Sequence, residues 1–368
     1  MTVLTSTAAP ASAQDREALA ASVRDLIRRR GDSASVRAAM AGDGRTDAAL
    51  WSTLCTEIGV AALAIPESYD GAGASFAETA AVLEELGAAL SPVPALGSAV
   101  LATAAILIAD DPDSSARLLP GMAAGERTAA LCWAGAGGWD TTDVRADAGL
   151  LSGTAHFVID GEVADTLLVI ASGGEAITLH EVDADADGIT VTPLPTMDPT
   201  RPLSSVTFDD VASVVIPAPA DLTARLRALG WALLASEQVG GAQAALDLTV
   251  DYTGSRKQFG RTIGSFQALK HRMADMYVLV ETARSIARAA VDAVVTGAPD
   301  AADLARAAHV YCSEAYTSVT GEAIQLHGGI GITWEHDIQL YFKRAHGSAQ
   351  LLGAPSRAVA EIAAELRA

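Results

Sequence analysis

The chain has 368 residues, half of them hydrophobic and 5% aromatic, with 25 Lys and Arg against 45 Asp and Glu and a formal net charge of −20. This charge repels nucleic acid and anionic membrane surfaces, so neither is expected as a partner. Three widely spaced cysteines and a start without a basic segment followed by an apolar stretch argue against a disulfide framework, a zinc site and a signal peptide, and favour the cytoplasm.

Residues 1–125 are expected to form an N-terminal helical domain. Apolar residues recur at spacings of three and four in REALAASVRDLIRRR, DAALWSTLCTEIG and FAETAAVLEELGAAL, the pattern of amphipathic helices. A long apolar run, LGAALSPVPALGSAVLATAAILIA, is interrupted by Pro92 and Pro94. It is therefore interpreted as buried helix and turn rather than as a membrane span.

The pattern changes over residues 126–220, which are expected to form a central β domain. Short segments such as LLSGTAHFVID, DTLLVIAS, AITLHEV and GITVTPL alternate with Gly, Asp and Pro turns and indicate a small sandwich or barrel-like domain. Long helical patterns return over residues 221–368, with helices predicted at 222–253, 266–296 and 301–326. The chain is therefore predicted to be an α+β protein that ends in a helical bundle.

The stretch RKQFGRTIGSFQALKHRMADM places basic and glycine residues directly ahead of a long helix. Arg256 offers a planar guanidinium for bidentate phosphate binding, while Gly260 and Gly264 allow close approach of the backbone. A helix N-terminus with surface charges would explain the same residues. A second glycine cluster, QLHGGIGIT from Gln325, is by itself more often a helix stop than a phosphate cradle. The two clusters together are more specific for an anionic ligand than either alone.

These two stretches, together with VAALAIPESYDGAGASFAETAAVLEELGAAL and AIQLHGGIGITWEHDIQLYFKRA, resemble the flavin-dependent acyl-CoA dehydrogenases along nearly the whole chain. The resemblance implies an N-terminal helical domain, a central β domain and a C-terminal four-helix bundle, with FAD bound between subunits. One subunit's β domain would hold the flavin ring. Its neighbour's Arg-x-x-Phe-Gly and Gly-Gly segments would bind the pyrophosphate and the adenosine.

The resemblance assigns this second, adenosine-binding half of the FAD site to residues that this chain retains. Arg256 would pair with the pyrophosphate. We call the full set of cofactor-binding residues the adenosine grip, and it consists of Arg256, Gln258, Phe259, Phe266, Gln267, Gln325, Gly328 and Gly329.

The flavin-binding half departs from the family pattern. Where members usually show Thr-Glu-Pro and then Gly-Ser-Asp, this chain reads CWAGAGGWD, with Trp133 at the threonine and Trp139 at the serine. The segment usually written Trp-Ile-Thr-Asn-Gly reads FVIDG, with Phe157 at the tryptophan and Ile159 at the threonine. Three hydroxyl groups expected to hydrogen-bond the flavin are missing, and indoles add bulk there. Alternatively, a subfamily holds the flavin through backbone groups.

The implied reaction removes the α-proton of an acyl-CoA thioester while the β-hydrogen leaves as hydride to the flavin, and a glutamate normally serves as the base. The two positions that the family uses correspond to Leu352 and Gly230, and neither residue accepts a proton. Glu237 lies two turns beyond Gly230 on the same helix face, about 10 Å away, and is the candidate catalytic residue. Two interpretations stay open: a base with a raised pKa, or a structural residue paired across the bundle.

The remaining histidines give no metal site, because His156, His271 and His346 lack the paired spacing of metal ligands. His336, in the segment TWEHD, is interpreted as part of a cap and solvated turn rather than as a catalytic group.

Three functions follow from the resemblance. In the first, the chain is one subunit of a heteromeric acyl-CoA dehydrogenase, such as a heterotetramer, and shares its FAD with a second dehydrogenase-like subunit. Assemblies of this kind occur in the family among actinobacterial enzymes that act on steroid CoA thioesters. The alternatives are a self-sufficient homo-oligomeric dehydrogenase, with Glu237 or another acid as base, and a non-catalytic scaffold that kept the fold. No motif identifies the electron acceptor.

Overall fold

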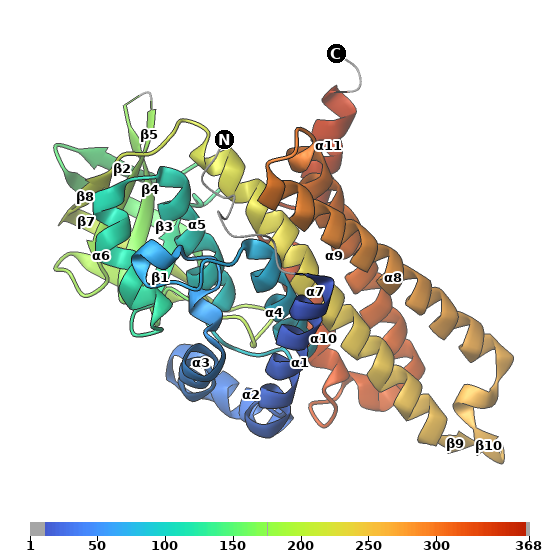
Figure 1. The fold of residues 1–368 in the computed structure, drawn as a ribbon. Coiled ribbons are helices and arrows are strands. Elements are labelled where there is room, and N and C mark those ends of the chain that lie inside the picture. The colour runs from blue at the N-terminus through green and yellow to red at the C-terminus, as the bar shows by residue number, and fades with distance from the viewer. Residues whose placement is uncertain (1–11, 175, 366–368) are drawn as a thin grey trace.

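The computed structural model describes residues 12–174 and 176–365, and it is helical up to Ala123 (Figure 1). The α-helices of this part are α1 (Ala13–Arg30), α2 (Ser33–Ala41), α3 (Ala48–Thr53), α4 (Phe76–Ala88), α5 (Thr103–Ala109) and α6 (Pro112–Ala123). Capping boxes start α1 at Ser12 and α4 at Ser75. The long apolar run continues beyond α4 as the buried π-helical segment η5 (Ala95–Ala102) and α5. Within the described ranges, no helix combines the length and apolar character needed to cross a membrane.

One sheet follows the N-terminal helices. Its strands are β1 (Ala129–Cys132), β2 (Val144–Asp147), β3 (Leu150–Ile159), β4 (Thr166–Gly173), β5 (Ala176–Asp183), β6 (Ile189–Pro193), β7 (Leu203–Ala212) and β8 (Val214–Ile216). They pair in the order β6-β7-β3-β2-β4-β5-β8, and β1 adds to β4 in parallel. The segments expected to be strands are therefore strands, but they join one continuous sheet.

The central strand β4 explains how this sheet is held between two cores. Its side chains alternate, so Leu167 and Val169 enter a core internal to the sheet, while Leu168 and Ile170 enter the main core shared with the N-terminal helices. Both faces of the strand are thus apolar, which accounts for the unbroken hydrophobic sequence TLLVIA.

The C-terminal part is a helical bundle. Its helices are α7 (Leu222–Ser255), α8 (Gln267–Thr296), α9 (Ala301–His327), α10 (Ile338–Ser348) and α11 (Pro355–Glu365). The three long predicted helices are confirmed to within two residues at each end. Helix α7 runs through the middle, packed against α4, α8, α9 and α10 (Figure 1). Its approach to α4 depends on glycine, because a Cβ at Gly240 would lie 1.8 Å from the Glu84 carbonyl oxygen.

Candidate functional site

A short hairpin carries the first part of the adenosine grip. Strands β9 (Lys257–Gln258) and β10 (Arg261–Thr262) project from the far end of the bundle, between α7 and α8 (Figure 1). Both turn residues have positive φ, 54° at Phe259 and 77° at Gly260, as a two-residue type I′ turn requires. The turn leaves the Phe259 ring 92% exposed at the tip. The sequence indicated the need for a glycine here but not the hairpin.

The second part of the grip lies beside the same end of the bundle. Tyr252, one turn before Arg256, stacks on His327 with ring centroids 4.5 Å apart, and Gly328 and Gly329 follow His327 directly. A Cβ at either glycine would meet no atom within 4 Å, and Gly328 has a φ of +64° that favours glycine. Two segments about seventy residues apart in sequence are thus brought together, with exposed backbone at their surface.

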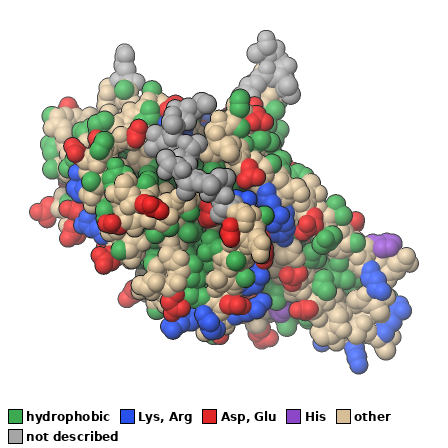
Figure 2. Space-filling view, viewed as in Figure 1, with side chains coloured by type: hydrophobic (Ala, Val, Ile, Leu, Met, Phe, Trp, Pro, Cys, Tyr) green, Lys and Arg blue, Asp and Glu red, His purple; other side chains and the backbone are tan. Residues whose placement is uncertain are grey.

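This end of the bundle is also basic and aromatic. Lys257 and Lys270, two of the three lysines of the chain, lie on it, and Figure 2 shows Lys and Arg side chains gathered there. The Arg261 guanidinium lies 3.8 Å from the centre of the Phe266 ring. Arg256, Gln258, Gln267 and Gln325 are exposed. Exposed cations next to exposed aromatic faces and open glycine backbone suit a phosphate and an attached base, so these residues fit the adenosine half of FAD.

The flavin-binding half carries apolar side chains where the family has hydroxyl groups, beside a cavity of about 330 Å³ whose lining includes Trp139 and Phe157. Trp133 and Trp139 are 3% and 6% exposed, and their rings meet edge to face with centroids 5.7 Å apart. The Arg227 guanidinium lies 5.4 Å from the Trp133 ring centre and donates to the Trp139 carbonyl at 2.5 Å. Ile159, in place of the threonine, is also buried. These residues offer indole edges and apolar surface where the family's flavin ring meets hydroxyl donors, so their chemistry does not match the family's contacts to the ring.

The two positions that would hold a catalytic base meet at one point. A Cβ at Gly230, on α7, would lie 2.4 Å from the Leu352 Cδ1 atom and 3.2 Å from the Leu101 Cδ2 atom. Leu352 is fully buried. The two positions are therefore adjacent in space, as expected if both correspond to the family's base, and the point where they meet is filled with apolar side chains.

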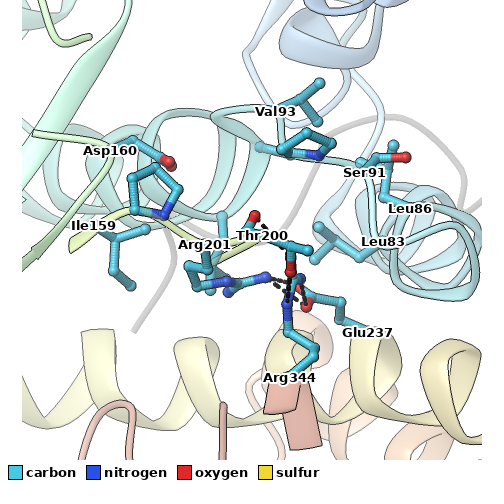
Figure 3. Close-up of a pocket in the computed structure, with 14 residues that line it drawn as sticks. Leu83, Leu86, Ser91, Val93, Ile159, Asp160, Thr200, Arg201, Glu237 and Arg344 are labelled. Atoms are coloured by element: carbon cyan, nitrogen blue, oxygen red, sulfur yellow. Dashed lines mark hydrogen bonds and ion pairs between the residues drawn. The ribbon is translucent and has the colours of Figure 1, made fainter. Parts of the chain in front are cut away.

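Glu237 belongs to a buried ionic cluster. Its carboxylate accepts from Arg201 Nη2 at 2.5 and 2.6 Å and from Arg344 Nη1 at 2.8 Å (Figure 3). Burial alone would raise the pKa of Glu237, but the two guanidinium groups outweigh it and lower that pKa. The expectation of a base with a raised pKa is thus wrong about the direction of the shift. The carboxylate is instead paired across α7, α10 and the loop before β7.

Three further members of this cluster were not anticipated. Arg344 also pairs with Asp198 at 2.6 Å and donates to Thr200 Oγ1 at 2.6 Å. Asp160 lines the same narrow cavity from the turn after β3 (Figure 3). The sequence carried one signal for the cluster, a charged residue on the buried side of α10 in IQLYFKRA, and buried charges require partners.

The described residues contain no group of three or more His, Cys, Asp or Glu side chains that could hold a metal ion. His336 accepts a hydrogen bond at Nδ1 from the Ile338 backbone N–H at 3.1 Å, at the start of α10.

Comparison with known proteins identifies the family. Residues 13–126 match the acyl-CoA dehydrogenase N-terminal domain, and residues 228–366 match the acyl-CoA dehydrogenase C-terminal domain. The chain therefore belongs to the acyl-CoA dehydrogenase family of FAD-dependent oxidoreductases.

Individual relatives narrow the resemblance. Acyl-CoA dehydrogenase IpdE2 of Mycolicibacterium smegmatis is 43% identical over 353 residues, which span 96% of this chain and 99% of that protein. The ChsE4-ChsE5 complex from Mycobacterium tuberculosis matches with a TM-score of 0.89 at 28% identity, over 97% of this chain and 98% of that one. The "Tcur3481-Tcur3483 steroid ACAD G363A variant" matches at 0.87 and 28%, over 96% and 99%. The chain thus resembles subunits of heteromeric dehydrogenases.

Proposed function

We propose that this chain is one subunit of a heteromeric acyl-CoA dehydrogenase that introduces an α,β double bond into an acyl-CoA thioester. In this assembly it contributes the adenosine grip to an FAD whose flavin ring lies on a partner subunit, together with the catalytic base. FAD, when bound, supplies the hydride acceptor. Steroid-derived acyl-CoA thioesters are the proposed substrate class, since one of the similar structures is named a steroid dehydrogenase.

One asymmetry carries this proposal. The residues that a neighbour would use, Arg256 and the Gly328–Gly329 pair, are exposed and open. The residues that this chain would need for its own flavin ring, at Trp133 and Trp139, are buried against one another. A chain that served only as a scaffold would have no use for a basic, aromatic surface at the end of its bundle. A chain with its own flavin would need hydrogen-bond donors where the indoles pack.

The homo-oligomeric alternative has less support because its base is unsuitable. A base for proton abstraction needs a free carboxylate within hydrogen-bond reach of the substrate. Both oxygens of Glu237 accept from Arg201, one of them also accepts from Arg344, and the side chain is 5% exposed. Ion pairing with two guanidinium groups makes this carboxylate a weak base, and burial keeps substrate away from it.

The test is the visible absorption spectrum of the purified chain, alone and then coexpressed with an acyl-CoA dehydrogenase-like chain encoded beside it. We expect a colourless protein alone and a yellow, active complex with about one FAD for each pair of unlike subunits. A yellow chain that binds about one FAD per subunit by itself, and is bleached by acyl-CoA, would contradict the proposal and establish the homo-oligomeric enzyme.

A further inference from the structure

The narrow cavity beside Glu237 is where all three parts of the chain meet. Its polar lining includes Ser91, from the segment after α4, Asp160 and Arg201, from the sheet and its loops, and Glu237 and Arg344, from the bundle (Figure 3). Thr200 adds a further polar group, and the apolar lining comes from the N-terminal helices and their loops, from Ile159 and from Pro202. Any molecule held in this cavity would contact the N-terminal helices, the sheet and the bundle at the same time.

Two polar atoms around this cavity lack a hydrogen-bond partner within the part of the chain that the structure describes. They are the Nη1 atom of Arg201 and the Oγ atom of Ser91, both buried. Buried polar atoms in native proteins are nearly always paired, either with protein or with ordered water. The cavity has about 20 Å³ of room. A single water needs about 10–15 Å³ and two to four polar partners, so the space suits one water and nothing larger.

Asp160 ties this cavity to the N-terminal helices. Its Oδ2 atom accepts a hydrogen bond at 3.2 Å from the backbone N–H of Gly97, in η5. The approach depends on glycine, because a Cβ at Gly97 would lie 2.5 Å from that oxygen. Asp160 itself has a φ of 58° in the turn after β3 and is 5% exposed.

The other charges of the cluster balance one another and leave Asp160 without a counter-charge. Arg201 and Arg344 provide two positive charges, and Glu237 and Asp198 provide two negative charges that pair with them. An ionised Asp160 would therefore add a net negative charge to a buried cluster that is already neutral. A protonated Asp160 would leave the cluster neutral and could donate a hydrogen bond to the water.

We propose that the cavity holds one ordered water and that this water and a protonated Asp160 form a joint between η5, the sheet and the bundle. The joint is intact when Asp160 carries a proton and is weakened when that proton is lost. Burial raises the pKa of Asp160 to about 7, against the opposing effects of Arg201, the Gly97 N–H and Arg344, and Glu237 reinforces the rise. The joint therefore responds to pH near neutrality, and the response belongs to this chain whatever partner it binds.

The sign of the pH dependence follows from that rise. The folded pKa exceeds the unfolded value of 3.8, so this group's contribution to stability is complete below pH 3.8 and is lost progressively as the pH rises from there through about 7. Asp160→Asn keeps an acceptor for the Gly97 N–H and a donor for the water while removing the titration. Asparagine is also the residue in the family segment that corresponds to FVIDG. Asp187→Asn is the matched control, because it removes an exposed carboxylate from the loop between β5 and β6.

Three measurements on the chain alone test the proposal. A crystal structure should contain a water within about 3.2 Å of Arg201 Nη1 and an Asp160 carboxyl oxygen. The Asp160 carboxyl carbon should titrate by NMR with a midpoint near neutrality. Thermal unfolding should show an advantage of Asp160→Asn over the wild type that grows by about 3 °C between pH 5 and pH 8.5, while the difference between Asp187→Asn and the wild type stays the same over that interval.

Other outcomes would overturn the proposal. A dry cavity, or a side chain that has moved into it, rules out the water. A midpoint near the ordinary aspartate value, or an Asp160→Asn variant whose melting temperature follows the wild type at every pH, rules out the protonated joint. If the variant does not fold, the water density and the wild-type titration still decide the matter. None of these results depends on FAD or on a partner, so they stand apart from the heteromer test.

Discussion

At the scale of single residues, the buried charges matter most for stability. Glu237 is held by Arg201 and Arg344, and the Arg344 side chain is 2% exposed. A buried ion pair contributes little net stability, but removing one partner leaves an uncompensated charge. Replacing Glu237 should mainly reduce turnover if it is a base, and should mainly reduce stability if it is the counter-ion of the two arginines. One substitution therefore separates the two roles.

Glu237→Gln should lower the free energy of unfolding by about 3–5 kcal/mol, because two guanidinium groups lose their shared carboxylate. Denaturant unfolding of the chain at pH 7.5 measures this. Glu281→Gln, which removes an i,i+3 partner of Arg284 on the bundle surface, is the control and should stay within about 0.5 kcal/mol. A normal unfolding curve for Glu237→Gln, combined with lost turnover in the complex, would instead favour a catalytic base.

His309 gives a pH dependence of opposite sign to that of Asp160. The ring is stacked on Trp231 with centroids 5.1 Å apart, and Nε2 donates to the Gly353 carbonyl oxygen at 2.7 Å. Burial lowers the pKa of His309 to about 4, below the unfolded value of 6.5. Its contribution to stability is therefore complete above pH 6.5 and is lost as the pH falls toward 4.

The wild type should accordingly lose about 1 kcal/mol per pH unit through this group between pH 6 and pH 4. His309→Gln keeps a donor for the Gly353 carbonyl and should lose less over that interval, as measured by denaturant unfolding at each pH. His271→Gln, on the exposed surface of α8, serves as the control. Identical slopes for the wild type and His309→Gln would show that the ring does not titrate in this way.

At the scale of elements, the hairpin β9–β10 has a conformation that its own sequence does not favour. A phenylalanine with positive φ is unusual, and such strain typically costs about 1–3 kcal/mol. The ring gains little burial in the described part of the chain to offset that cost, since it is 92% exposed and lies edge on to Phe266 with ring centroids 6.2 Å apart. The strain is consistent with a side chain that acts on another molecule.

Phe259→Asn should therefore raise the free energy of unfolding of the chain by about 0.5–1 kcal/mol, because asparagine tolerates the left-handed conformation of a type I′ turn. The same variant should weaken assembly of the FAD-containing complex. Denaturant unfolding and FAD content of the coexpressed complex measure the two effects. An unstable variant, or one that assembles normally with full FAD, would contradict the role given to Phe259.

The elements also mark the limit of what the sequence predicts. Helices α7, α8 and α9 were predicted almost to the residue, because their periodicity and stop signals are local. Strand segments were also predicted, but their order in one sheet was not, since pairing such as β3 with β7 joins residues about fifty apart. The ionic cluster escaped prediction for the same reason, because Asp160, Arg201, Glu237 and Arg344 come from four separate segments. The hairpin strain required φ angles that the sequence does not display.

At the scale of the whole molecule, the two halves of the family's FAD site differ: the adenosine-binding half is exposed, and the residues at the flavin-binding half are largely buried. The grip at the end of the bundle is exposed, whereas Trp133 and Leu352 are buried. A single FAD shared between unlike subunits would use the first and have no need of the second. In the sequence, this difference between the two halves is visible only in the motifs. In the structure, it corresponds to exposed side chains at the grip and buried side chains at Trp133 and Leu352.

Arg256→Ala should reduce FAD retention in the coexpressed complex by a loss of about 1.5–3 kcal/mol in binding free energy, because a charge-assisted contact with phosphate is removed. The chain itself should unfold as the wild type does, since the side chain is exposed and lies outside both cores. FAD content after gel filtration, with Arg28→Ala on the exposed surface of α1 as the control, measures the loss. Full FAD content in Arg256→Ala would remove Arg256 from the grip.

The distribution of lysines has a practical consequence. A protease that cleaves only after lysine has three sites in this chain, and two of them, after Lys257 and Lys270, lie at the hairpin end of the bundle. Lys270 and Lys343 sit within helices, whereas Lys257 lies in the exposed hairpin. Proteases need an extended, accessible backbone, so the native chain should be cut first after Lys257. This cut falls between α7 and α8 and divides the bundle between two fragments. The rate of that single cut would then report, without any dye or assay substrate, whether a subunit covers the tip.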